Sequence, residues 1–534
     1  MNNTDNSLSI AASAFTLNAM QKVGLAIGGI GLLILFVALG YTFPNPTLPL
    51  VISLSTITLG TVIYAHATYS HLLTEKSGQA SGIKNNGIWF KSLTNKGALA
   101  WISGIVITGF YVILYWFPQY LGLAVAEGAA NTGLVALFDP LSQALAGKAA
   151  SQWFVYGALY TVAILALGYK FILKYRHNKY QQIRTISVMF FQLGFAFMLP
   201  AILESLNQPY YNFANMWPLN YYFFDDWHLQ GMIDSGALGL FMMIFGIAMF
   251  LLISPILTYF YGKRWYCSWV CGCGGLAETA GDPFRQLSDN SMKAWKIERW
   301  MIHSVLVFSV VMTAAVLFSV LHDSGKGFWV SKPMFVGILV AIIGGFAAIL
   351  YFKPKFFKQL DKKILPYVYG IGGFLAVWSI VMLVSGQYNL FFVDSYVLRS
   401  NYGFLIGSAF SGVVGVGFYP IMGSRVWCRF GCPMAAVLGL QQKFFSRFRI
   451  TTNSGQCISC GNCSTYCEMG IDVRAYAQKG QDIVRASCVG CGICAAVCPR
   501  GVLRLENGSD DIDVRAEEVR ALHISTDGGI KLEM

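Results

Sequence analysis

Cysteine is the residue type whose spacing in this chain points most directly to chemistry. Eight of the thirteen cysteines lie beyond residue 450, in two runs that share the spacing C-x2-C-x2-C-x3-C. In iron–sulfur proteins such spacing lets three thiolates of one loop hold a cubane, while the fourth thiolate reaches the cubane of the other run. We therefore predict one [4Fe–4S] cluster on Cys457, Cys460, Cys463 and Cys498, and a second on Cys488, Cys491, Cys494 and Cys467.

Zinc and disulfides are the alternatives for these two runs. Zinc sites use C-x2-C pairs that lie far apart, and disulfides are rare in the cytoplasm, where we expect this segment to lie. Pro499 follows the last cysteine of the second run, as is typical of two-cluster ferredoxins, but Glu468 stands at the matching position of the first run. Because proline is not a ligand, we expect Glu468 to affect packing and reduction potential and to leave the ligand set unchanged.

The other cysteines lie in two similar segments, at 264–273 and 425–433. Each segment follows an apolar stretch and contains a basic residue, an aromatic residue and then C-x3-C. Side chains at i and i+4 are neighbours on a helix, so each pair presents two thiolates in one direction. The two pairs are Cys267 with Cys271, and Cys428 with Cys432.

Three interpretations of these four thiols stay open. They hold a third iron–sulfur cluster, they are redox-active dithiols, or they are buried structural cysteines that behave as small apolar residues. Cys273 has no counterpart in the other segment and offers a substitute ligand. Arg264 and Arg429, one in each segment, are expected to raise the reduction potential of a nearby cluster by favouring its more negative, reduced form.

The composition indicates which elements position these cysteines. Apolar residues make up 55% of the chain and charged residues only 12%, whereas a soluble protein carries roughly a quarter charged residues. The apolar residues form blocks of about 20, long enough to cross a bilayer as helices. We predict about ten spans, near residues 20–42, 47–66, 97–117, 152–173, 185–203, 235–261, 300–321, 334–352, 365–385 and 402–422.

Basic residues alternate between the loops and predict the orientation. Lys and Arg are concentrated in the loops at 76–96, 170–184, 263–299, 353–363 and 425–449, whereas the opposite loops hold only Lys148, Lys326, Lys332 and Arg399. The positive-inside rule then places both termini in the cytoplasm of a bacterial inner membrane. The net charge of +12 comes largely from these loops, so it reflects the orientation in the membrane and does not indicate nucleic-acid binding.

Three parts of the chain follow from this reading. Residues 1–234 hold about five spans, and residues 235–450 form a transmembrane core with both C-x3-C motifs. Residues 451–534 form a small α+β bacterial ferredoxin-like domain and a tail. The predicted fold is thus mainly α, a polytopic transmembrane helix bundle with a two-cluster domain at its C-terminal end.

The two C-x3-C motifs followed by a two-cluster domain resemble the NapH/NosR-type membrane polyferredoxins, over roughly residues 235–500. Pro433 follows Cys432 as in that family, whereas Gly272 replaces the expected proline after Cys271. The resemblance implies electron transfer between the quinone pool, or another reductant, and a respiratory or maturation partner. The N-terminal half departs from the NosR pattern, and no flavin-attachment motif of the S-G-A-T kind is present, so a flavin is not supported.

Weaker signals lie outside the cysteine motifs. Asp226 and His228, in an aromatic outer loop, are candidates for protonating a quinol head group, although Tyr and Trp at a membrane edge are usually anchors. The spacing of the histidines does not support haem, and the chain has no nucleotide-binding glycine motif.

The predicted function is that of an oxidoreductase component, a membrane-bound iron–sulfur relay. It links a cytoplasmic redox partner to the quinone pool or to a partner on the outer face. Two alternatives stay open: a maturation factor that reduces a metal ion or disulfide on a client protein, and a redox sensor.

Overall fold

The structure, a computed structural model, describes residues 17–69, 96–126, 128–322, 330–352, 365–508, 522–524 and 530–532. Within these ranges, nine helical runs are long and apolar enough to cross a membrane. They are α1 (Ala19–Ala38), α2 (Thr47–Tyr69), α4 (Ala98–Trp116), α7 (Gln152–Lys174), the run Lys179–Ser205, the run Gly236–Tyr261, α15 (Met292–Val320), α16 (Lys332–Phe352) and α17 (Leu365–Val384). Each coincides with one of the first nine predicted spans.

Two of these runs are interrupted by wider, π-helical turns. The first consists of α8 (Lys179–Phe190), a π segment (Phe191–Met198) and α9 (Leu199–Ser205). The second consists of α11 (Gly236–Ala248), a π segment (Met249–Ile253) and α12 (Ser254–Tyr261). In both, a proline is the second residue after the π segment, Pro200 or Pro255, and its missing N–H removes one helical hydrogen bond there.

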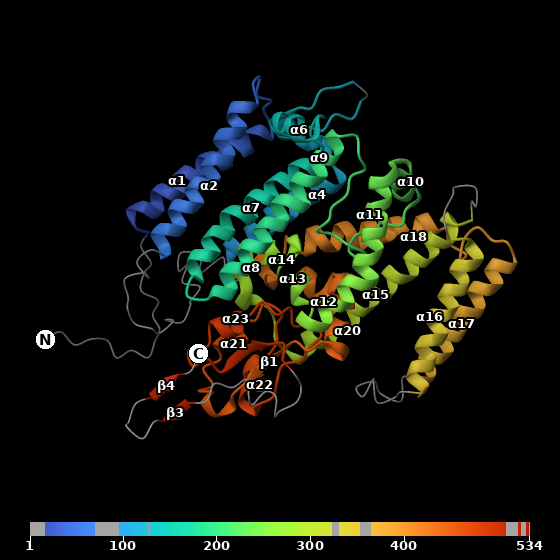
Figure 1. Cartoon of the computed structure of the whole chain (residues 1–534). Helices are drawn as coiled ribbons and strands as arrows, with labels where there is room; N and C mark the ends of the chain where they lie inside the picture. The colour runs from blue at the N-terminus through green and yellow to red at the C-terminus, as the bar shows by residue number, and fades with distance from the viewer. Residues whose placement is uncertain are drawn as a thin grey trace.

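The tenth predicted span, 402–422, is wrong as a continuous helix. The chain is helical through α18 (Ser395–Tyr402) and a π segment (Gly403–Val414), then turns, and resumes only in the short α19 (Tyr419–Met422). Glycines at 412, 415 and 417 weaken a helix and allow close packing, and a Cβ at Gly417 would lie 2.4 Å from Thr108 Oγ1 on α4. Figure 1 shows this orange segment crossing the molecule towards its centre.

Short helices occupy the two ends of the bundle. At the end far from the red C-terminal domain lie α6 (Asp139–Ala146) and α10 (Asp226–Asp234) (Figure 1). Near the centre, the cysteine segments form α13 (Arg264–Cys267) and α14 (Gly272–Thr279), then a π turn (Trp427–Gly431) and α20 (Pro433–Phe445). A 3-10 helix (Asp282–Leu287) follows α14, and α5 (Gly133–Leu137) precedes α6.

Three residues, 446–448, separate the end of α20 from the first strand of the C-terminal domain. Its strands β1 (Arg449–Thr452) and β2 (Leu503–Glu506) pair antiparallel, with Ile450 opposite Leu505. Between them lie α21 (Asn462–Thr465), α22 (Val473–Lys479) and α23 (Ile493–Ala496). A separate hairpin is formed by β3 (Leu522–Ile524) and β4 (Ile530–Leu532).

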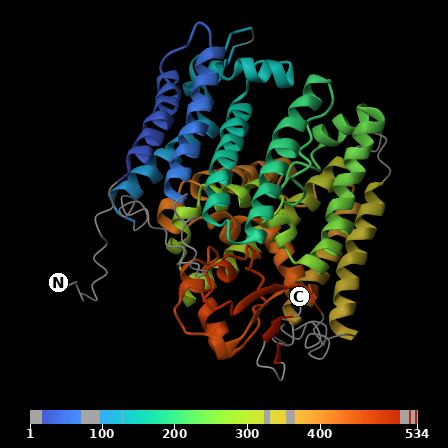
Figure 2. The same cartoon turned by 60° about the vertical axis from the view of Figure 1, so that its left-hand side comes forward.

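The C-terminal domain packs against one end of the helix bundle. Figure 2 shows it below the helices, at the end of the bundle where α1 begins. A continuous buried apolar cluster joins the two parts, and it contains cysteines of both C-x3-C pairs together with Cys463, Cys488 and Cys494. The basic residues predicted at 76–91, 326 and 353–363 lie outside the described residues.

Candidate iron–sulfur centres

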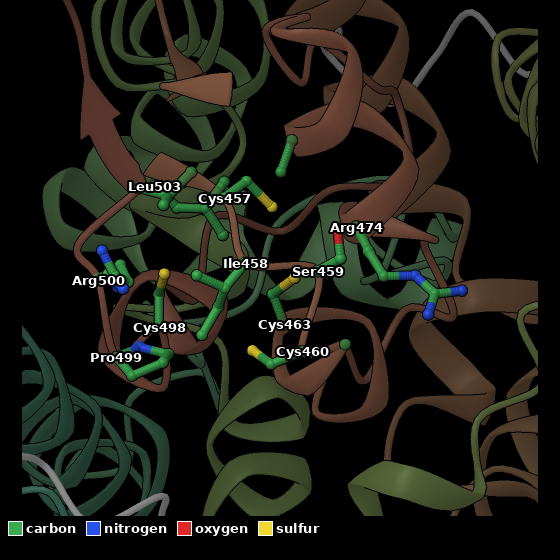
Figure 3. Close-up of a pocket in the computed structure, with 13 residues that line it drawn as sticks. Cys457, Ile458, Ser459, Cys460, Cys463, Arg474, Cys498, Pro499, Arg500 and Leu503 are labelled. Carbon is green, nitrogen blue, oxygen red and sulfur yellow. The ribbon is translucent and has the colours of Figure 1, made fainter. Parts of the chain in front are cut away.

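The first centre is a cavity at the surface of the C-terminal domain. Its lining includes Cys457, Cys460, Cys463 and Cys498, the first predicted set of four thiols (Figure 3). Gly461 precedes α21 with φ +80°, a conformation that favours glycine and lets the loop turn tightly around its cysteines. Cys460 is exposed and the neighbouring Ile458 is 54% exposed, so this centre faces outwards.

The second centre is a cavity deeper in the same domain. Its lining includes Cys467, Cys488, Cys491 and Cys494, the second predicted set, together with Glu468. Burial raises the pKa of Cys467 and of Cys491 to about 12, so these thiols release protons when a metal binds them. Both donor sets therefore fit a cubane in number and in chemistry, with the fourth cysteine exchanged between the runs.

The loop of the second run is held by the membrane part of the chain. Every backbone carbonyl from 488 to 491 accepts a hydrogen bond from a side chain outside the domain. The donors are Gln442 to Cys488 (2.8 Å), Ser268 to Val489 (2.9 Å), Tyr180 to Gly490 (2.8 Å) and Gln181 to Cys491 (2.7 Å). A cluster on this loop would thus be fixed relative to α8, α13 and α20.

Gly490 and Gly492 make this close approach sterically allowed. Both have positive φ, at +62° and +74°. A Cβ at Gly490 would lie 2.7 Å from Cβ of Arg264, and one at Gly492 would lie 2.9 Å from Tyr180 Cε1. Any larger residue would push the second loop away from the helix bundle.

The two C-x3-C segments have the same local structure. In each, the first cysteine lies in a single helical turn, and the second is extended and forms the N-cap of the following helix, α14 or α20. The second cysteine also donates its N–H to the carbonyl five residues earlier in both copies: Cys271 to Tyr266 (2.9 Å) and Cys432 to Trp427 (2.9 Å). The segments are structural repeats.

The structure brings the four repeat cysteines together. Cys267, Cys271, Cys428 and Cys432 are each 6–7% exposed and belong to one apolar cluster. Burial raises the pKa of Cys428, and the neighbouring Arg425 opposes that shift. The fifth thiol, Cys273, is half-buried beside Cys271. Four buried thiols from two repeats form a donor set that suits soft metals and iron–sulfur clusters.

Arg425 connects this site to the second ferredoxin run. Its Nη1 donates to the carbonyl of Cys267 (3.2 Å) and lies 3.7 Å from Cys428 Sγ. Its Nε lies 3.0 Å from Glu468 Oε1, and Glu468 directly follows the cluster ligand candidate Cys467. The other oxygen of Glu468 pairs with Arg285 at 2.7 Å.

A wider buried ion network surrounds Arg425 and Glu468. Glu278 pairs with both Arg184 and Arg425, and Asp282 pairs with Lys174 (2.6 Å) and Arg285 (2.9 Å). Buried charges are costly unless they are paired, so these residues hold the domain and the helix bundle in one arrangement. The unusual Glu468, noted above in place of a proline, is the only domain residue among these pairs.

Sequence reasoning missed Arg425 and selected its neighbours. Arg429 pairs with Glu298 (2.8 Å) and donates to the carbonyl of Asp289 (2.7 Å). Arg264 packs over Phe448 and donates to Asn507, and it lies beside the second ferredoxin run, where its charge opposes the rise that burial causes in the pKa of Cys488. The only available signal was that Arg425 lies three residues before Cys428, as Arg264 lies three before Cys267.

The weaker candidates Asp226 and His228 lie at the other end of the molecule, on α10 (Figure 1). His228 is buried, its Nδ1 lies 3.1 Å from the carbonyl of Phe223, and burial lowers its pKa. The preceding acid, Asp225, pairs with Arg399 at 2.6 Å. The quinol site at Asp226 and His228 stays a prediction.

Comparison with known proteins supports the iron–sulfur assignment. The family described as "4Fe-4S dicluster domain" matches residues 456–503, and the family "4Fe-4S binding domain" matches twice, at 237–290 and 404–451, once over each C-x3-C repeat. No solved structure matches. The chain is also 23% identical, over 227 residues, to YccM of Escherichia coli (strain K12), whose name proposes a role in electron transport; the match covers 42% of this chain and 47% of YccM. The chain therefore contains 4Fe–4S ferredoxin-type domains, and an iron–sulfur electron-transport function is supported.

Proposed function

We propose that this protein relays electrons between a cytoplasmic redox partner and the membrane through three iron–sulfur centres. Two [4Fe–4S] clusters would be held by the sets of four thiols in the C-terminal domain. A third cluster would be held by Cys267, Cys271, Cys428 and Cys432. When bound at these thiols, such clusters supply one-electron redox steps.

The observation that carries this proposal is the nested order of the three donor sets. The first set opens to the surface at the exposed Cys460, and the second lies on a loop whose carbonyls accept hydrogen bonds from the helix bundle. The third lies in a buried apolar cluster with Cys463, Cys488 and Cys494 of the other two sets. Arg425 contacts the third set and, through Glu468, the second. Its positive charge favours the reduced, more negative state of either centre.

The orientation follows from charge and topology together. We infer that the end of the bundle carrying the C-terminal domain faces the cytoplasm, in a bacterial inner membrane. The broken segment 395–422 returns the chain to this end after the nine long apolar helical runs of the described residues. The acceptor on the membrane side would be the quinone pool or a partner on the outer face.

Kinship with the NapH/NosR-type polyferredoxins belongs to the same proposal. The double match of one 4Fe-4S family to the two repeats supports it. YccM, which carries a name from electron transport, supports the same general role.

The test uses vesicles that contain menaquinone and enclose ferricyanide. The protein is reduced by photoreduced deazariboflavin, and quinol formation and ferricyanide reduction are followed. Electron flow to either acceptor is expected in the wild type, and loss of that flow in C428S/C432S, with both ferredoxin clusters retained. The control is C273S, a cysteine change outside the four-thiol set. Flow that persists in C428S/C432S would overturn the proposal.

A further inference from the structure

The exposed charged side chains that line the first cavity are both basic. Arg474 and Arg500 line this cavity together with the exposed Ile458, Cys460 and Pro499 (Figure 3). Both arginines are exposed, and neither forms an ion pair within the described part of the chain. Two basic side chains and an apolar one therefore line the same cavity as the exposed Cys460.

Within residues 449–508, no exposed acidic side chain balances this charge. Over residues 449–508 the exposed charged side chains are all basic: Arg474, Lys479, Arg500 and Arg504. The four acids of the same range are buried or half-buried, and each contacts a group of this chain. Glu468 pairs with Arg285, Asp472 accepts from Ser464, Asp482 lies near Arg449, and Glu506 accepts from Thr451.

We propose that this surface, defined by Ile458, Cys460, Arg474 and Arg500, is the docking site of an acidic one-electron carrier protein. The proposal rests on the relay function and names the chemistry of its cytoplasmic partner. A positive surface around a redox centre speeds the encounter with a negative partner, and the effect weakens with salt. The apolar Ile458 gives the docked partner a dry contact beside the centre.

The proposed reaction transfers a single electron from the carrier protein to the first cluster. A reduced carrier docked here would lose one electron, and a cluster held by Cys457, Cys460, Cys463 and Cys498 would gain it. No covalent bond forms or breaks, and no proton has to move. The docking surface therefore needs only to bring the carrier close and to release it, which suits exposed charges better than buried ones.

The experiment measures reduction of the full-length protein in nanodiscs by stopped flow. The probe is reduced flavodoxin, an acidic one-electron carrier, and the comparison reductant is photoreduced deazariboflavin, which is uncharged. The variant R474E/R500E reverses the charge at the cavity. The matched control K479E/R504E makes the same change in charge on exposed residues that do not line the cavity.

The expected result is a second-order rate with flavodoxin that falls by about tenfold or more in R474E/R500E, and by less than about threefold in K479E/R504E. The wild-type rate should also fall between about 50 mM and about 500 mM NaCl. The rate with deazariboflavin and the EPR signal of the first cluster should not change.

Other outcomes overturn the docking site and leave the relay standing. Equal losses in the two variants would show a general charge effect, and a salt-independent rate would exclude electrostatic docking. A wild-type rate with flavodoxin that rises sharply on removal of residues 509–534, which are rich in acids, would assign the basic surface to this chain's own tail. If R474E/R500E loses its first cluster, the salt dependence of the wild-type rate with flavodoxin serves as the test: a rate that falls with salt supports electrostatic docking, and a rate independent of salt overturns it. Failure of the relay appears separately, as absent flow to the membrane acceptors from deazariboflavin.

Discussion

The two ferredoxin runs have identical cysteine spacing and opposite surroundings. The first run faces outwards, with Cys460 exposed and two unpaired arginines at the opening of its cavity within the described chain. The second run is covered by the helix bundle, which supplies a hydrogen bond to each carbonyl from 488 to 491. The cysteine spacing is therefore the same in the two runs, but the first cavity is open at the surface and the loop of the second is joined to the helix bundle.

Glu468 makes this difference between the runs. In the first run, the residue after the fourth cysteine is a buried acid that pairs with Arg285 and Arg425, whereas Pro499 in the second run is exposed. Glu468 connects the domain to the second C-x3-C repeat through Arg425. Pro499, at the matching position of the other run, is exposed and forms no such connection among the described residues. The predictions below test this contrast, beginning with the largest expected effect.

Removing the charge of Glu468 should have the largest effect. E468Q leaves Arg285 and Arg425 without their shared carboxylate, and breaking a buried ion pair costs about 3–5 kcal/mol. We expect the second cluster to be lost at a much lower denaturant concentration than in the wild type, measured by cluster absorbance and EPR. The control is E506Q, a half-buried acid of the same domain. Loss of the second cluster at the same denaturant concentration in E468Q and E506Q would contradict the role of Glu468 in holding the C-terminal domain against the helix bundle.

Arg425 and Arg429 should differ in their effect on potential. R425K keeps the charge but loses the guanidinium group that contacts Cys267, Cys428 and Glu468. The reduction potential of the proposed third cluster should therefore fall by on the order of 50 mV, which makes that cluster harder to reduce. Arg429 pairs with Glu298, so R429K should leave the potential nearly unchanged. Redox titration followed by EPR measures both variants. A larger shift in R429K would favour the original interpretation from sequence.

Oxidant access should distinguish the two ferredoxin runs in the wild type. The exposed first centre should be bleached by ferricyanide roughly tenfold faster than the second, because susceptibility follows exposure. The two EPR signals, followed after short exposures, give the two rates. Simultaneous loss of both signals would mean that the helix bundle does not shield the second centre.

Cys273 should have the smallest effect. The two repeats already supply four thiols, and Cys273 has no counterpart in the second repeat. C273S should therefore keep the iron of the third centre, whereas C271S should lose it. Iron analysis of the two variants is sufficient, and loss of iron in C273S would make this thiol a ligand.

Local patterns predicted the helices and the groups of cysteines. Nine spans follow from uninterrupted apolar blocks, because a block of that length has only one stable state in a bilayer. The tenth was wrong because hydropathy does not register the glycines at 412, 415 and 417, which end the helix and let it pack against α4.

The ion network was beyond sequence reasoning. Its members come from positions 174, 184, 278, 282, 285, 425 and 468, and apart from 282 and 285 they lie on separate elements that meet only in the folded chain. Choosing Arg429 instead of Arg425 shows the same limit, since adjacency to a cysteine along the chain does not determine which way a side chain points.

The central claim, a third cluster on the two repeats, is tested most directly by counting iron. Iron and labile sulfide per chain are measured on anaerobically purified protein, with EPR during stepwise reduction. The account predicts about ten to twelve iron atoms, and a further EPR signal that disappears in C428S while the two ferredoxin signals remain. About eight iron atoms in the wild type, the content of two cubanes, would contradict it.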